Sequence, residues 1–198
     1  MNIPIRRDRL VLMRRAALAL MTSVLLAGTA FVPGGTAHAQ TAAAQPKPAP
    51  APALLDKMLG NWVLRGTIEG KLATHDVDVS WVLNHGYLRI HEISREKSAS
   101  GVPDYEAIVL MSWDAKAGEI LCLWLDTTSN AGLSLMPAGL GHAKPTADSL
   151  PFAFFAGTPQ VFRTTMTYSA SANSWQWNMD GDENGKVTPF ARLVLTRK

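Results

Sequence analysis

The chain has 198 residues, 47% of them hydrophobic, and a formal net charge of +3. Residues 1–39 contain five Arg and one Asp, which leaves 14 Lys and Arg against 15 Asp and Glu in the rest of the chain. A nearly neutral domain without a basic cluster excludes the electrostatic footprint of nucleic-acid or anionic-membrane binding.

The N-terminal segment has the pattern of a secretory signal peptide. Two arginines precede an apolar run over residues 16–32, and the small residues Ala37 and Ala39 suit a signal peptidase. The run is short and rich in Ala, Gly and Thr, so an uncleaved membrane anchor is the less favoured alternative. We therefore expect residues 1–39 to be removed and the mature protein to be soluble and periplasmic or secreted. The sequence leaves open whether translation starts at Met1 or Met13.

Residues 40–53 are rich in Pro and Ala and contain no large apolar side chain. This composition is typical of an extended, solvated spacer. The domain itself is then expected to cover residues 54–198. It opens with Leu54, Leu55, Met58 and Leu59, whose helical spacing predicts a short helix.

From Trp62 onward the hydrophobic period is two, which predicts strands. About nine such segments follow one another, separated by turn residues. They cover residues 62–69, 76–83, 87–92, 105–113, 120–126, 150–156, 161–169, 174–181 and 187–197. Because no helical crossover pattern interrupts them, the fold class is expected to be all-β, with an antiparallel barrel favoured over a sandwich.

The first and last strands carry a recognisable combination of residues. Gly60 and Trp62 open the first strand, and Arg197 shares a face with the leucines that close the last. This combination resembles the calycin superfamily of lipocalins and fatty-acid-binding proteins. Together with Trp113-Asp114 and Trp124-Leu125-Asp126, it is most similar to a family of secreted bacterial lipocalin-like domains. The resemblance implies an up-and-down barrel that is sealed where Trp62 packs under Arg197, and the short helix is expected to plug one end.

The turn between the second and third strands decides which side chains face the interior. If residues 85–86 form a two-residue loop, Glu92 lies opposite Val79 on the inner face. In this register we expect His75 and His91 to face outward. The Glu92 carboxylate has no evident partner in the sequence, so it is a candidate anchor for a ligand.

The fourth and fifth strands are apolar on both faces. A strand pair of this kind needs cover outside the barrel, either from a second subunit in a homodimer or from the following segment. That segment, residues 127–150, has no hydrophobic period. It is predicted to be a functional loop such as a lid, or to contain a short strand.

Several apparent metal or nucleophile motifs favour a structural interpretation. The run Asp180-Gly-Asp-Glu-Asn-Gly185 resembles half of a calcium loop, but the twelfth position is Ala191, so a hairpin is expected. Asp76 and Asp78 lack a third ligand and are expected to form a solvated edge. Cys122 is the only cysteine and is expected to be a buried hydrophobe with a raised pKa. No metal site is predicted.

Catalytic signatures of the common hydrolases, nucleotide-binding proteins and zinc enzymes do not occur in the sequence. We therefore predict no catalytic residue and no cofactor, and we disfavour an enzyme. His142 lies in the irregular segment and could serve as a haem ligand or an acid/base group. A haem protein or barrel enzyme built on His142 is thus one alternative.

Five tryptophans beyond Trp62 favour a binding function. They are Trp81, Trp113, Trp124, Trp175 and Trp177. Each could simply pack in the core, but together with an inward Glu92 they would form an apolar cavity with one polar anchor. The sequence therefore predicts a binding protein for a small apolar or amphipathic molecule. A ligand-free homodimeric module is the second alternative, and the sequence does not name the ligand.

Overall fold

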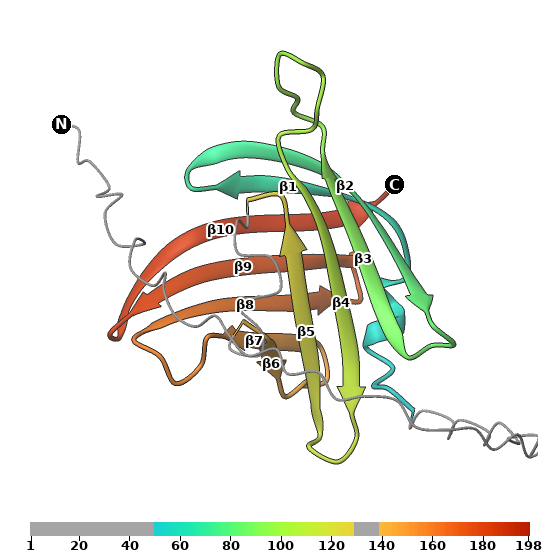
Figure 1. Cartoon of the computed structure of the whole chain (residues 1–198). Coiled ribbons are helices and arrows are strands. Elements are labelled where there is room, and N and C mark those ends of the chain that lie inside the picture. Colours follow the sequence, from blue (N-terminus) through green and yellow to red (C-terminus); the bar gives the residue numbers. More distant parts are fainter. Residues whose placement is uncertain (1–49, 129–138) are drawn as a thin grey trace, which may run out of the picture. The chain divides into compact units, whose positions relative to one another are not determined.

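The computed structural model describes residues 50–128 and 139–198. Within them, one sheet of ten antiparallel strands closes into a barrel in the order β1-β10-β9-β8-β7-β6-β5-β4-β3-β2 (Figure 1). The strands are β1 (Gly60–Ile68), β2 (Lys71–Val82), β3 (Tyr87–Ser94), β4 (Glu106–Asp114), β5 (Glu119–Asp126), β6 (Gly141–Ala143), β7 (Ser149–Phe154), β8 (Gln160–Ser169), β9 (Ser174–Glu183) and β10 (Lys186–Arg197). The predicted all-β barrel is confirmed, and the tenth strand is β6. The predicted signal peptide lies outside the described residues, as does the spacer up to residue 49.

The closing hairpin forms where the sequence predicts it. Asn184 and Gly185 both have positive φ, 52° and 83°, as a two-residue type I′ turn requires. Glu183 therefore pairs with Lys186, and the Asp182 carboxylate accepts the backbone N–H of Gly185. The acidic run belongs to this hairpin rather than to a calcium loop.

The register between β2 and β3 differs from the predicted one by two residues. Trp81 pairs with Leu88, and Val77, rather than Val79, pairs with Glu92. The reason is a longer turn, in which Leu83 and the two residues after it all have positive φ. Leu83 is consequently 76% exposed. Because the shift is an even number of residues, the faces are preserved, and Glu92 still points inward as expected.

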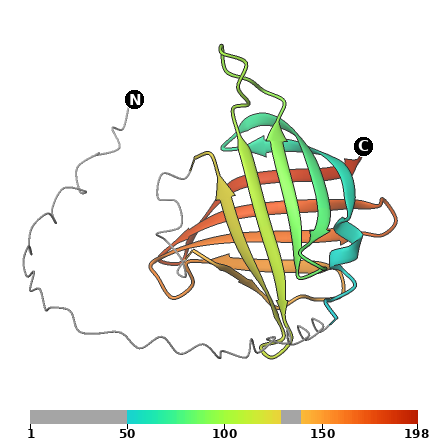
Figure 2. The same cartoon turned by 45° about the vertical axis from the view of Figure 1, so that its right-hand side comes forward.

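The 3-10 helix η1 (Leu55–Met58) covers one end of the barrel, opposite the projecting β3–β4 connection (Figure 2). Leu55 and Met58 are fully buried in the barrel core. Trp62 fixes the helix by donating its indole N–H to the carbonyl of Met58 at 2.6 Å. The predicted plug is thus confirmed. None of the described residues forms a helix long and apolar enough to cross a membrane.

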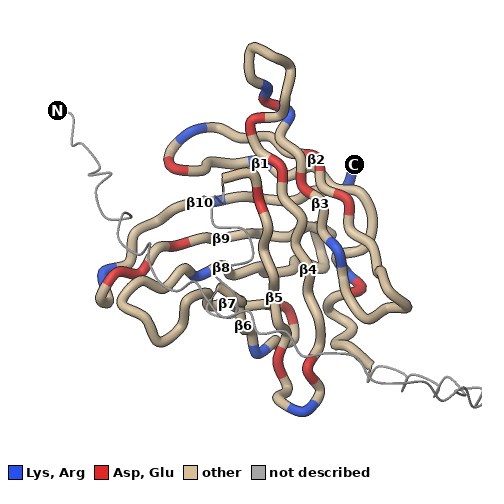
Figure 3. The backbone as a smooth tube through the Cα atoms, in the orientation of Figure 1, with Lys and Arg blue, Asp and Glu red and all other residues tan. Residues whose placement is uncertain are grey.

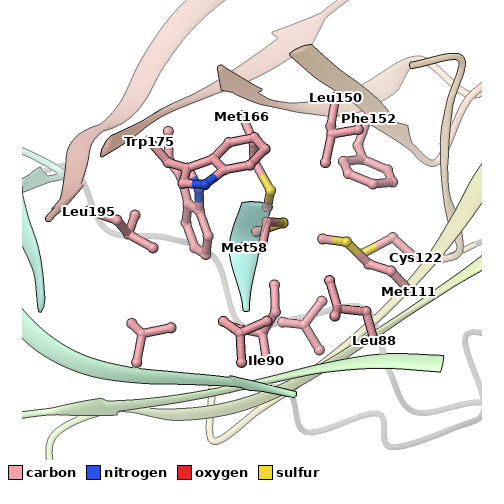
Figure 4. Packing of buried hydrophobic residues seen from close by; sticks show 14 of the residues in the cluster. Met58, Leu88, Ile90, Met111, Cys122, Leu150, Phe152, Met166, Trp175 and Leu195 are labelled. Atoms are coloured by element: carbon pink, nitrogen blue, oxygen red, sulfur yellow. The ribbon is translucent and has the colours of Figure 1, made fainter. Parts of the chain in front are cut away.

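Side chains from strands around the whole barrel meet behind this plug (Figure 4). Those labelled are Met58 of η1 and, from the strands, Leu88, Ile90, Met111, Cys122, Leu150, Phe152, Met166, Trp175 and Leu195, none more than 2% exposed. Burial raises the pKa of the Cys122 thiol, as the sequence led us to expect. The half of the barrel nearest η1 is therefore a packed core.

The outer wall of β2 and β3 is charged (Figure 3). Arg95 contacts Asp76 at 2.7 Å, and Arg89 pairs with Asp78. The hydrogen bond from Arg95 is the main reason that the pKa of Asp76 falls to about 2. Both aspartates are thus engaged with arginines on a solvated surface, consistent with the expected edge.

Candidate functional site

The barrel seal has the predicted partners. Trp62 lies opposite Arg197 in the β1–β10 register, and the guanidinium carbon is 3.7 Å from the centre of the indole ring. Arg197 also donates to the carbonyl of Leu59. Gly60 has a φ of 108°, and a Cβ there would lie 2.6 Å from Nη1 of Arg197. The positive φ favours glycine at position 60 and Arg197 packs over Trp62, so the Gly-x-Trp pair is structural.

A cavity of about 610 Å³ occupies the opposite half of the barrel. This volume lies within the range of small-molecule sites, about 300–1,000 Å³. Much of its wall is aromatic, formed by Tyr105, Trp124, Phe154, Phe155, Phe162 and Phe190. Two pairs of these rings contact edge to face, Phe162 with Phe190 at 5.3 Å and Trp124 with Phe154 at 6.4 Å between centroids. The wall thus offers a preformed apolar surface.

The polar side of the cavity is a buried histidine–glutamate pair. Nδ1 of His75 forms a very short contact with Oε1 of Glu92, and the two side chains are only 4% and 3% exposed. Oε2 of Glu92 is buried and makes no hydrogen bond with the described residues. The imidazole of His75 stacks on Tyr105, with centroids 5.5 Å apart. One carboxylate oxygen is therefore held by the protein, and the other is unsatisfied.

The inward position of His75 corrects our expectation that it faces outward. His75 follows the alternation of Val77 and Val79 on β2, and all three side chains are buried. That alternation was visible in the sequence. His75 is a polar residue at a position where the alternation along β2 places buried apolar side chains, and this could have indicated that it pairs with Glu92.

Tyr105 is a second functional candidate that sequence reasoning missed. Its hydroxyl accepts the indole N–H of Trp124 at 3.0 Å. Burial, reinforced by the charge of Glu92, raises the pKa of this phenol far above its ordinary value. Tyr105 therefore keeps its proton and can donate a hydrogen bond inside the cavity.

The structure divides the five tryptophans between the two halves of the barrel. Trp124 lines the cavity with Glu92, and Trp177 packs on Trp124 with ring centroids 6.2 Å apart. Trp175 belongs to the packed core, where it donates to the carbonyl of Lys57 in η1. Trp81 bonds to Asp56 at the same end, and Trp113 packs against the core. Of these five, Trp124 alone lines the cavity.

His142 lies away from the cavity. It stands on β6 with its side chain 47% exposed on the outer face, where Nδ1 is 3.1 Å from Glu119. Among the described residues, no group of three potential metal ligands occurs. The described geometry therefore gives no support to a haem or catalytic site built on His142.

The outer face of the β4–β5 hairpin is apolar, as the sequence indicated. Its side chains are partly exposed, and they are Ile108, Leu110, Leu121, Leu123 and Leu125. A homodimer formed through this face stays a prediction.

Comparisons with known proteins concern the fold. No protein-family model matches the chain. No curated protein matches it either. Among solved structures, the chain is similar to the crystal structure of Rv2717c from M. tuberculosis, with a TM-score of 0.48 and 15% sequence identity over 76% of this chain and 99% of that one. A similarity this distant indicates nothing about a ligand.

Proposed function

We propose that the protein is a secreted, lipocalin-like binding protein for a small amphipathic molecule. The apolar body of the ligand lies against the aromatic wall, and its polar end is hydrogen-bonded to Glu92. The observation that carries this proposal is a cavity of about 610 Å³ lined by Glu92, a residue whose buried Oε2 makes no hydrogen bond with the described residues.

The physical reason is the free-energy cost of an unsatisfied buried carboxylate oxygen, on the order of 1–3 kcal/mol or more. A hydroxyl or amine of a ligand would satisfy Oε2, while His75 holds Oε1 in a fixed orientation. Tyr105 adds a donor on the same side of the cavity. The site thus presents an acceptor and a donor next to an apolar surface, which is the composition of a site that orients an amphipathic ligand.

Fluorescence titration tests this function. The purified domain is titrated with a panel of fatty acids, retinoids, hydrophobic dyes, long-chain alcohols and amphipathic amines, with tryptophan emission and melting temperature as readouts. Binding near Trp124 should change the emission. Glu92→Gln should weaken binding of ligands that carry a hydroxyl or amine by about tenfold, the loss of one charge-assisted hydrogen bond.

Glu106→Gln is the matched control, because Glu106 lies on the outer face and bonds to His91 at 2.8 Å. This variant should bind the panel as the unmodified protein does. If no compound changes the emission or the melting temperature, the cavity is not a binding site for this class of molecule.

A further inference from the structure

We propose that the cavity selects an organic cation, such as a protonated amphipathic amine, over a fatty acid or a neutral lipid. This inference rests on the proposed function, since it names the ligand class of the same cavity. Three features of the described residues carry it: the balance of charge in the lining, the unsatisfied Glu92 and the aromatic wall.

The lining is strongly acidic. It contains Lys71 and the imidazole of His75, which is paired with Glu92, against five carboxylates, which are Glu69, Glu92, Glu96, Asp104 and Asp126. Acidic segments, red in Figure 3, lie on the β1–β2 hairpin and around the base of the β3–β4 connection. Because low-dielectric walls focus the field of such a group, the cavity attracts cations and repels anions.

Hydrogen bonds hold Glu96, at the mouth of the cavity, in its charged form. Glu96 accepts the hydroxyl of Ser94 at 2.8 Å and the backbone N–H of Thr74 at 3.2 Å. Burial alone would raise its pKa, but these hydrogen bonds outweigh burial, so the pKa of Glu96 is lowered. Asp126 likewise accepts the backbone N–H and the hydroxyl of Thr128. The negative charge of Glu96 is therefore stabilised by the fold.

Glu92 extends this charge to the buried end of the cavity. It is 3% exposed, and its Oε2 makes no hydrogen bond with the described residues. A neutral hydroxyl would satisfy this oxygen, but an ammonium group would also offset the carboxylate charges at the mouth. A fatty-acid carboxylate placed here would instead face the like charge of Glu92.

The wall suits the same ligand class. A cation within about 6 Å of an aromatic face is stabilised by the ring quadrupole, most strongly by Trp. Trp124 and Tyr105 line the cavity with Glu92, and four phenylalanines complete the wall. An aromatic enclosure around a buried carboxylate is a chemically complete site for an alkylammonium group.

The test compares three probes of equal size by calorimetric titration. They are 4-phenylbutylammonium, its neutral analogue in which a methyl group replaces the ammonium group, and the corresponding phenylalkyl carboxylate. The cation should bind about tenfold more tightly than the neutral analogue, as a desolvated cation–π contact provides. The carboxylate should bind most weakly, and the preference for the cation should shrink as salt is added.

A variant at the mouth identifies the source of the preference. Glu69 and Asp104 are exposed, so Glu69→Gln with Asp104→Asn should leave the fold intact. It should weaken binding of the cation by about fivefold, the upper range for exposed charges, without affecting the neutral analogue. Glu106→Gln with Asp148→Asn is the matched control, since neither residue lines the cavity.

Two outcomes overturn the inference. If the neutral analogue or the carboxylate binds as tightly as the cation, cation selection is wrong, while the proposed binding function stands. If none of the three probes binds and the wider panel also fails, the proposed function falls with it.

Discussion

Replacing both members of the His75–Glu92 pair with apolar side chains should stabilise the fold while removing the ligand site. The pair is almost fully buried, and Oε2 of Glu92 has no partner among the described residues. Exchanging a buried ion pair for apolar residues of similar volume ranges from neutral to about 1–4 kcal/mol stabilising, because the desolvation cost disappears. The double variant His75→Phe/Glu92→Leu should fall in this range. Phe preserves the ring that stacks on Tyr105.

The single variants should behave very differently from the double. His75→Phe leaves the Glu92 carboxylate buried with neither oxygen bonded, which should cost about 3–5 kcal/mol. Glu92→Leu removes one hydrogen bond of His75 but adds apolar burial, and these contributions of about 1–3 kcal/mol each nearly cancel. The coupling energy between the two sites should therefore be at least about 3 kcal/mol, the top of the range for residues in contact.

Urea unfolding at neutral pH, followed by circular dichroism, measures these free energies. An unchanged m-value in all four proteins is the control, since it shows that the unfolded states are comparable. The reasoning is refuted if His75→Phe is as stable as the unmodified protein, or if the double variant is less stable than His75→Phe. Either result would mean that Glu92 is not a desolvated charge.

Three further outcomes are expected. Trp62→Ala should cost about 3–5 kcal/mol of unfolding free energy, and a double-mutant cycle with Arg197→Met should give a coupling of about 1 kcal/mol. A coupling of zero would show that the stacked geometry adds no stability. Because Arg95 lowers the pKa of Asp76 from 3.8 to about 2, stabilisation by this pair should be present above the unfolded pKa and lost as pH falls through the folded value. Asp76→Asn should therefore unfold more readily than the unmodified protein at about pH 6 and equally readily below pH 2, whereas equal denaturation curves throughout would disprove the linkage. Finally, the exported protein should begin near Gln40, so an intact mass that retains residues 16–32 would contradict signal cleavage.

The fold was largely predictable, because alternation over short segments specifies strands and the end residues specify closure. Trp62 and Arg197 pair as expected. The β2–β3 register was not predictable, because a slip of two residues buries the same faces, so the hydrophobic pattern cannot distinguish the two alternatives. The deciding feature is the run of positive φ from Leu83 to His85, and only conformation reveals it.

The site was predictable only in part. Glu92 and Trp124 could be identified as candidate site residues from their residue type and from their positions in the alternation along their strands. The position of a tryptophan along its strand decides which end of the barrel it occupies. Amino-acid composition carries no information about this position. Trp175 therefore looked equivalent to Trp124, although it packs against η1. The partner of Glu92 comes from a neighbouring strand, so it was unidentifiable until the register was known.

The seal also has a consequence for the order in which the barrel is completed. Trp62 and Arg197 lie at almost opposite ends of the described chain, and their pairing is the contact that closes the sheet. Loop-closure entropy makes so distant a pairing late and slow in folding. The last strand, β10, is 12 residues long. Until it is in place, the edge of β1 that it will cover remains open and can pair with another chain. A chain truncated before β10 should therefore aggregate through exposed strand edges, whatever the stability of the strands already formed.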